Sequence, residues 1–117
     1  MKKKIYYLAS CSTCQRIMKE VGVDASFEQQ NIKEQAITPA QLEEMHQLAG
    51  SYEALFSRRS LKFREWSLHE KELTESDYRD LILKEYTFLK RPVFLIGKQI
   101  YIGNTKQVVE AVKQALA

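Results

Sequence analysis

The chain has 117 residues, of which 44% are hydrophobic and 28% charged, and its formal net charge at pH 7 is +3. These values fit one soluble globular domain with a core of its own. No apolar run approaches the roughly 20 residues of a membrane-spanning helix, so we expect no membrane insertion. The positive excess is small and the basic residues are scattered, which argues against direct nucleic-acid binding.

The first part of the chain predicts a strand, a helix and a second strand. Lys3 to Ala9 is rich in Ile and Tyr and reads as a buried strand. The following segment places its apolar residues on one helical face and ends at Gly22. Residues 25–31 predict a second, weaker strand. A strand, a helix of about ten residues and a second strand form a compact βαβ unit, so we expect the two strands to be parallel.

The middle of the chain is predicted to be helical. Thr38-Pro39-Ala40-Gln41 is a capping box with proline at the first helical position, and Gly50 ends that helix. Tyr52 to Phe56 predicts a short turn of helix, and Thr74 to Asp77 begins another helix.

The last part of the chain predicts two strands and a helix. Val93 to Ile96 is an apolar strand that follows Pro92, and Gly97-Lys98 is a two-residue turn. Residues 99–102 then return antiparallel to the preceding strand, and Thr105 caps the last helix.

The predicted order is βαβ, a helical segment, then ββα, which resembles the thioredoxin-like fold with a helical insertion. We therefore expect an α/β fold with a mixed four-stranded sheet flanked by helices. It would form a single domain over residues 1–117, with the insertion at about 35–90. Pro92 is tolerated at the first residue of a strand. In thioredoxin-like folds a proline at this position is usually cis and faces the redox cysteine.

Cys11-Ser12-Thr13-Cys14 lies between the first predicted strand and the first predicted helix, which favours a redox motif. Unpaired N–H groups and the helix dipole at a helix start favour a thiolate, the reactive form of cysteine. Cys11 at the predicted cap is therefore the candidate nucleophile. Cys14, about one turn further on, could attack a mixed disulfide or a sulfenic acid at Cys11.

Two other interpretations of the cysteines stay open. A structural zinc site needs two further ligands, and His46 and His69 are not paired at such a spacing. The cysteines could also be small buried hydrophobic residues. A lipidation signal is rejected, because the apolar stretch before Cys11 is shorter than the roughly 7–15 residues of a signal core. Without a signal or a span we expect a cytoplasmic location, where such a motif is more often catalytic or sensory than structural.

Three features together resemble the arsenate reductase family, meaning the glutaredoxin-coupled arsenate reductases and their Spx-type relatives. They are the run Cys11-Ser12-Thr13-Cys14-Gln15-Arg16, the mid-chain Arg59, and Lys90-Arg91-Pro92 before two predicted strands. The resemblance spans nearly the whole chain, including the helical insertion.

The resemblance implies roles for several residues. In the family, an arginine of the insertion and the arginine before the proline hold the oxyanion, and they match Arg59 and Arg91. The arginine fork suits a tetrahedral oxyanion that a thiolate must attack. Arg16 matches an arginine on the first helix, although a solvated surface charge is an open alternative there and the favoured interpretation for Arg58. The resemblance assigns catalysis to Cys11, Cys14, Arg59 and Arg91, and substrate binding to Ser12, Thr13, Arg16 and Pro92.

Two departures from the family pattern favour thiol chemistry over arsenate. Gly103 stands where the arsenate reductases carry a third oxyanion arginine, and Cys14 stands where they have serine. We therefore expect a thiol-dependent oxidoreductase that reduces an oxyanion or a disulfide through Cys11. Cys14 or glutathione would resolve the adduct, and glutaredoxin or thioredoxin would donate electrons. We expect no bound cofactor, no metal and a monomer.

The alternative is a Spx-like redox regulator that binds the C-terminal domain of the RNA polymerase α subunit, with Cys11 and Cys14 as its switch. A glycine at the polymerase contact of Spx resembles Gly50, although its spacing to Arg59 is one residue longer here. Such a contact needs no DNA-reading motif.

Overall fold

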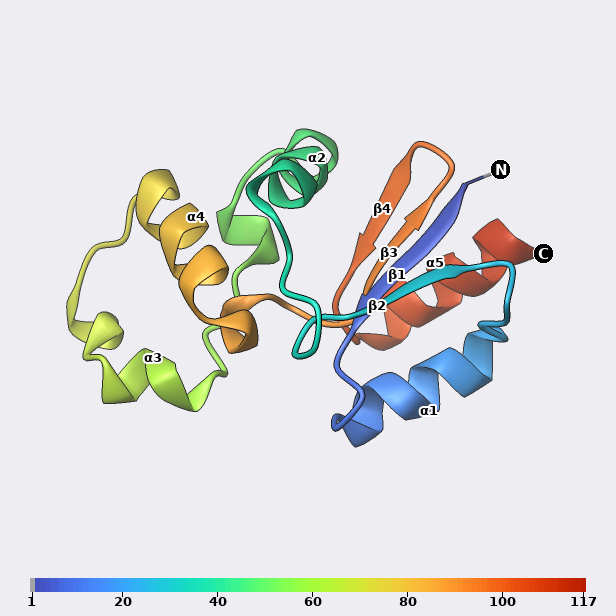
Figure 1. Ribbon diagram of the computed structural model, residues 1–117, viewed down its shortest axis with the longest axis horizontal. Helices are drawn as coiled ribbons and strands as arrows, with labels where there is room; N and C mark the ends of the chain where they lie inside the picture. The colour runs from blue at the N-terminus through green and yellow to red at the C-terminus, as the bar shows by residue number, and fades with distance from the viewer. Residues whose placement is uncertain (1) are drawn as a thin grey trace. The chain divides into compact units, whose positions relative to one another are not determined.

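The computed structural model describes residues 2–117, which form two compact units, residues 2–35 with 91–117 and residues 36–90. The first unit contains a four-stranded sheet in the order β2-β1-β3-β4 (Figure 1). Its strands are β1 (Lys3–Tyr7), β2 (Glu28–Asn31), β3 (Val93–Ile96) and β4 (Gln99–Ile102).

The sheet is mixed, as predicted. β1 pairs with β2 in parallel, and β3 pairs antiparallel with both β1 and β4. The strands lie where the sequence predicts them, although β1 ends two residues earlier and β2 begins at Glu28 rather than at residue 25. The predicted α/β fold class is confirmed, and so is the βαβ unit with its two parallel strands.

Helices α1 (Ser12–Val21) and α5 (Lys106–Leu116) cover one face of this sheet (Figure 1). Their apolar stripes pack against strand side chains, and each fully buried aliphatic or aromatic side chain contributes about 1.5–3 kcal/mol. This core fixes the start of α1 against the end of β1. Its fully or nearly fully buried members are Ile5, Ile17, Phe27, Phe94, Ile96, Val109 and Val112.

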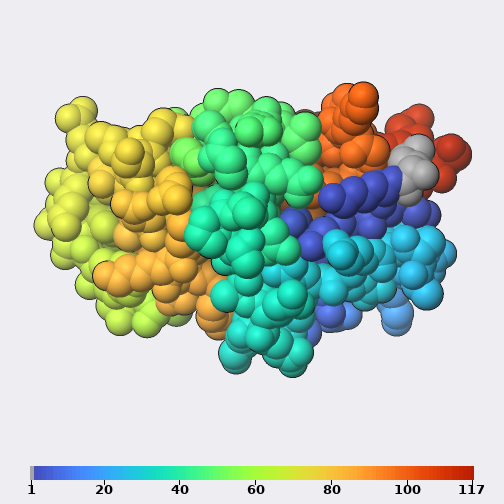
Figure 2. All heavy atoms as spheres, turned by 45° about the horizontal axis from the view of Figure 1, so that its top comes forward, coloured from blue at the N-terminus to red at the C-terminus, as the bar shows by residue number. Residues whose placement is uncertain are grey.

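The second unit is helical, with α2 (Pro39–Ala49), α3 (Leu61–Glu65) and α4 (Glu75–Lys84) joined by the 3₁₀ turns η1 (Glu53–Leu55), η2 (Leu68–Glu70) and η3 (Tyr86–Phe88). The predicted capping box of α2 is present, with the Thr38 hydroxyl accepting from the Gln41 N–H at 3.1 Å. The outward face of α2 lies at the surface, in teal and green in Figure 2. Gly50 ends α2 in the left-handed conformation, at φ 90°.

Helix α3 is an element that the sequence did not predict. It has five residues, too few for an apolar stripe to repeat, and none of them is buried. Its start is fixed by Ser60, whose hydroxyl accepts from the Lys62 N–H at 3.2 Å. None of the helices within residues 2–117 is long and apolar enough to cross a membrane.

Candidate active site

One end of the sheet brings three predicted positions together. Tyr6 of β1 pairs with Val93 of β3, so β1 leaves the sheet at the end where β3 enters it. Pro92 therefore lies at the end of the sheet from which the chain runs on to Cys11. Gly103 follows β4 at that same end, and its N–H donates to the Pro92 carbonyl at 2.9 Å.

The loop between β1 and α1 is held by hydrogen bonds on both sides. The Cys11 N–H donates to the Leu8 carbonyl at 3.0 Å, which closes a turn. The Ala9 N–H donates to Asn31 Oδ1 at 3.3 Å, and Gln15 Nε2 donates to the Ala9 carbonyl at 3.1 Å. These contacts fix the backbone that presents Cys11. Sequence reasoning missed Asn31 and Gln15, because their partners are backbone groups that only the fold identifies.

Cys11 occupies the N-cap of α1, as predicted, with extended backbone angles and its carbonyl accepting from the Gln15 N–H at 3.2 Å. Burial raises the pKa of the Cys11 thiol. Hydrogen bonds from the N–H and thiol of Cys14 and from the Thr13 N–H lower that pKa, as does the charge of Arg91, and together they outweigh the effect of burial. The net result is a pKa below the ordinary value, which favours the thiolate.

Cys14 lies in the first turn of α1 and is fully buried, whereas Cys11 is half-buried, and both are free thiols. Burial is the largest cause that raises the pKa of Cys14, and the charge of Cys11 adds to it, so the value reaches about 11. The two neighbouring thiols therefore have opposite tendencies: one ionises readily and the other retains its proton.

The peptide bond between Arg91 and Pro92 is cis, the isomer expected from the thioredoxin-like pattern. Arg91 is half-buried, and its positive charge lowers the pKa of both cysteines. Pro92 is buried directly before β3. Between the cysteines, Ser12 is exposed and Thr13 half-buried. Six of the eight predicted site residues thus lie in the cysteine motif and at Arg91-Pro92, and Arg16 on α1 also belongs to the first unit.

The other predicted arginines differ in their surroundings. Arg16 is exposed on α1, with Nη1 3.5 Å from Glu20 Oε1, an ion pair along the helix surface. Arg59 is exposed in the second unit, and its guanidinium group has no hydrogen-bond or ion-pair partner within residues 2–117. Arg58, by contrast, is paired with Glu53 at 2.9 Å and hydrogen-bonded to Tyr78 Oη at 2.6 Å.

Within residues 2–117, no group of three or more His, Cys, Asp and Glu side chains is placed to hold a metal ion. His46 stacks on Tyr52 with ring centroids 3.9 Å apart, and His69 lies near Phe63 at 6.5 Å. Both histidines belong to the second unit.

A cysteine N-cap, a second thiol one turn on and a cis-proline before β3 define a thioredoxin-like protein with paired thiols. The model of the ArsC family matches residues 6–112, and the chain belongs to that family. This confirms the resemblance seen in the cysteine motif, Arg59 and Arg91-Pro92.

Sequence relatives and solved structures add two kinds of likeness. The Global transcriptional regulator Spx 2 of Bacillus anthracis is 28% identical over 104 residues, which cover 85% of this chain and 77% of that protein. A structure titled YFFB (PA3664) protein is 22% identical with a TM-score of 0.80, over 99% of this chain and 100% of that one. The arsenate reductase from Vibrio cholerae is 16% identical with a TM-score of 0.76, over 98% of both chains. At these identities the solved structures establish the shared fold.

Proposed function

We propose that the protein is a thiol-disulfide oxidoreductase in which Cys11 is the nucleophile and Cys14 the resolving thiol. The observation that carries this proposal is the opposite shift of the two thiols within the first turn of α1, downward at Cys11 and upward to about 11 at Cys14. A nucleophile must be a thiolate to attack, whereas a thiol that keeps its proton does not compete with Cys11 for the substrate.

The proposed cycle oxidises the cysteine pair and reduces the substrate disulfide by two electrons. The Cys11 thiolate attacks one substrate sulfur, the S–S bond breaks, and the other half leaves as a thiolate that takes up a proton. Cys14 loses its proton and attacks the Cys11 sulfur, which releases the second substrate thiol and leaves a Cys11–Cys14 disulfide. A dithiol donor such as glutaredoxin or thioredoxin, or two glutathione molecules, then returns both electrons.

Cations assist the attack, because a thiolate and an anionic substrate repel each other. Arg91 contributes through its charge on the cysteine motif. Arg59 has no acidic partner within residues 2–117 and is the second candidate, through its match to the insertion arginine of the family. Ser12, Thr13, Arg16 and Pro92 would bind the substrate beside Cys11. The same group of residues would admit an oxyanion, with arsenate the less favoured substrate because Gly103 supplies no charge.

A steady-state assay tests this proposal. The protein is mixed with a small disulfide and with glutathione and glutaredoxin, or with thioredoxin and its reductase. We expect turnover that Cys11→Ser abolishes and that Cys14→Ser slows or makes dependent on glutathione. Turnover that persists in Cys11→Ser would refute the assignment of the nucleophile.

A second candidate function rests on the likeness to Spx 2 of Bacillus anthracis. We infer a redox regulator whose Cys11–Cys14 pair controls binding to the RNA polymerase α subunit. Gly50, the candidate contact residue, is exposed at the end of α2, with nothing within 4 Å of the position of a Cβ atom. The surface there would admit the close approach of a partner.

A pull-down with the C-terminal domain of the polymerase α subunit tests this second function. Reduced and oxidised protein are compared, beside Gly50→Arg, which places a long side chain at the candidate contact, and Gly22→Arg, which places one at an equally open left-handed glycine of the first unit. Capture that changes with oxidation and is lost in Gly50→Arg alone supports a regulator. No capture in either redox state rejects it.

A further inference from the structure

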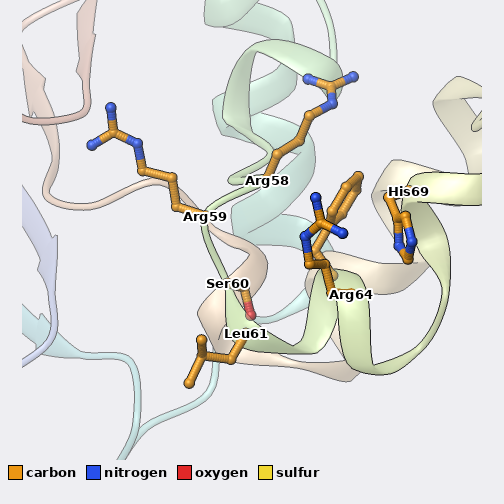
Figure 3. A pocket seen from close by; sticks show the side chains of 7 residues that line it. Arg58, Arg59, Ser60, Leu61, Arg64 and His69 are labelled. Atoms are coloured by element: carbon orange, nitrogen blue, oxygen red, sulfur yellow. The ribbon is translucent and has the colours of Figure 1, made fainter.

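A hollow of about 370 Å³ lies within the second unit, formed by the segment that leads into α3, by α3 itself and by η2 (Figure 3). Small-molecule sites commonly have volumes of about 300–1,000 Å³, so this hollow would hold a compact ligand. It does not include the cysteine motif. Its lining consists of Arg58, Arg59, Ser60, Leu61, Phe63, Arg64 and His69.

The lining carries positive charge without any acidic residue among its members. Arg58 is neutralised by its ion pair with Glu53 at 2.9 Å. The guanidinium group of Arg64, like that of Arg59, finds no hydrogen-bond or ion-pair partner anywhere in residues 2–117. His69 Nε2 lies 3.8 Å from Glu70 Oε1, so any charge on His69 is compensated like that of Arg58. Two uncompensated arginines beside one hollow favour an anionic ligand.

The same lining offers apolar surface. Leu61 is 87% exposed, the most exposed of the large apolar side chains within residues 2–117, although it stands beside the charged residues. Phe63 is half-buried and packs edge-on against Phe56, with ring centroids 6.1 Å apart, so its ring is held in place. A ligand that carried only charge would leave this surface uncovered. An anion with an apolar body would cover it.

The two uncompensated arginines lie on different sides of the hollow. In Figure 3 the side chains of Arg58, Arg64 and His69 extend on one side of the loop, whereas those of Arg59 and Leu61 extend toward the other side. Arg64 is therefore the partner available to an anion that also meets the aromatic side of the hollow.

We propose that this hollow binds a small organic anion, a carboxylate or phosphate monoester with an aromatic or aliphatic body. The anionic group pairs with the Arg64 guanidinium, and the apolar body packs against Leu61 and Phe63. This binding goes beyond the thiol chemistry and needs neither cysteine.

Titration calorimetry on the full chain tests the proposal with phenyl phosphate and phenylacetate. Inorganic phosphate supplies the charge without the body, and benzyl alcohol supplies the body without the charge. We expect at least one aromatic anion to bind more tightly than both of these controls. The tighter of phenyl phosphate and phenylacetate identifies the anionic group.

Three variants locate the binding. Arg64→Gln is expected to weaken it about ten- to a hundredfold, because a charge-assisted contact is lost. Arg79→Gln removes the same charge from α4, outside the lining, and should leave affinity unchanged. Leu61→Ser should weaken phenyl phosphate but not inorganic phosphate. Leu61 and Arg64 are exposed, so neither substitution should unfold the protein, which unfolding curves check.

Two results would overturn the proposal. One is that neither aromatic anion binds better than inorganic phosphate and benzyl alcohol. The other is that binding survives Arg64→Gln or falls equally in Arg79→Gln. The titration is repeated with Cys11→Ser, in which the proposed redox cycle is blocked. Binding in that variant shows that the hollow acts independently of the thiols, whatever the outcome of the disulfide assay.

Discussion

The N–H of Gly103 donates a hydrogen bond to the carbonyl oxygen of Pro92 at 2.9 Å. This contact places Gly103, which the sequence resemblance matches to the third oxyanion arginine of the arsenate reductases, beside the cis-proline at the end of the sheet that carries the cysteine motif. Gly103 has a φ of +92°, and nothing lies within 4 Å of the position that a Cβ would take. There is room for a side chain, but the backbone conformation is one that only glycine adopts readily.

Arsenate reduction by the unmodified protein is therefore expected to be weak or absent. Gly103→Arg should raise arsenate affinity about ten- to a hundredfold, because it adds a charge-assisted contact. It should also lower the free energy of unfolding by about 1–2 kcal/mol through the left-handed backbone. Gly103→Ala is the matched control, with the same stability loss and no gain in affinity. Calorimetry with arsenate measures the affinity, and urea unfolding measures the free energy of unfolding. Robust arsenate turnover by the unmodified protein would contradict the expectation of weak or absent reduction.

Arg58 and Arg59 are adjacent but should respond differently to the same substitution. Arg58→Gln breaks the contacts with Glu53 and Tyr78 and should cost about 0.2–1 kcal/mol of stability, as expected of a partly exposed pair. Arg59→Gln breaks no contact within residues 2–117, so stability should not change. In Arg59→Gln, turnover of an anionic substrate such as oxidised glutathione should fall about ten- to a hundredfold. Equal turnover in the two variants would remove Arg59 from the proposed site.

Arg91→Gln is expected to raise the pKa of Cys11, because the Arg91 charge is one of the causes that lower it. The alkylation rate near neutral pH should fall accordingly, since only the thiolate reacts. Arg91→Lys keeps the charge and should retain most of the rate. Arg16→Gln is a second control, because Arg16 is paired with Glu20 and is not among the groups that shift Cys11. A rate unchanged by Arg91→Gln would show that the helix start alone sets the reactivity.

Mild oxidation should join Cys11 to Cys14 within one chain. The two cysteines are the only ones in the sequence, and both are free thiols one turn apart. Intact-mass spectrometry should show the loss of two hydrogens from the monomer. A product that is mainly glutathionylated or dimeric through a disulfide would favour a mechanism with one cysteine.

The sequence predicted those parts of the fold that local patterns determine. Thr38 and Thr74 begin helices because their hydroxyls satisfy backbone N–H groups, a pattern that four residues are enough to show. The sequence also places Cys11 at a helix start, because Cys11 follows an apolar strand and precedes a helical stripe. The cis bond at Pro92 was only an expectation from the family pattern.

What the sequence could not show depends on contacts between distant residues. The support that Asn31 gives to Ala9 crosses from β2 to the end of β1, and nothing in either segment marks it. The hollow beside Arg64 and His69 depends on a turn at Ser67, which takes the left-handed conformation at φ 56° without being glycine. Neither α3 nor η2 is long enough for periodicity to reveal that turn.

The measurement that tests the central claim most directly is the pH dependence of thiolate absorbance in Cys14→Ser and Cys11→Ser. In Cys14→Ser the remaining Cys11 thiol should ionise below the value of about 8.5 for a free cysteine. In Cys11→Ser the buried Cys14 should ionise well above that value, because burial is the main cause of its raised pKa. A Cys11 thiol that ionises at or above the free-cysteine value would contradict its role as the nucleophile.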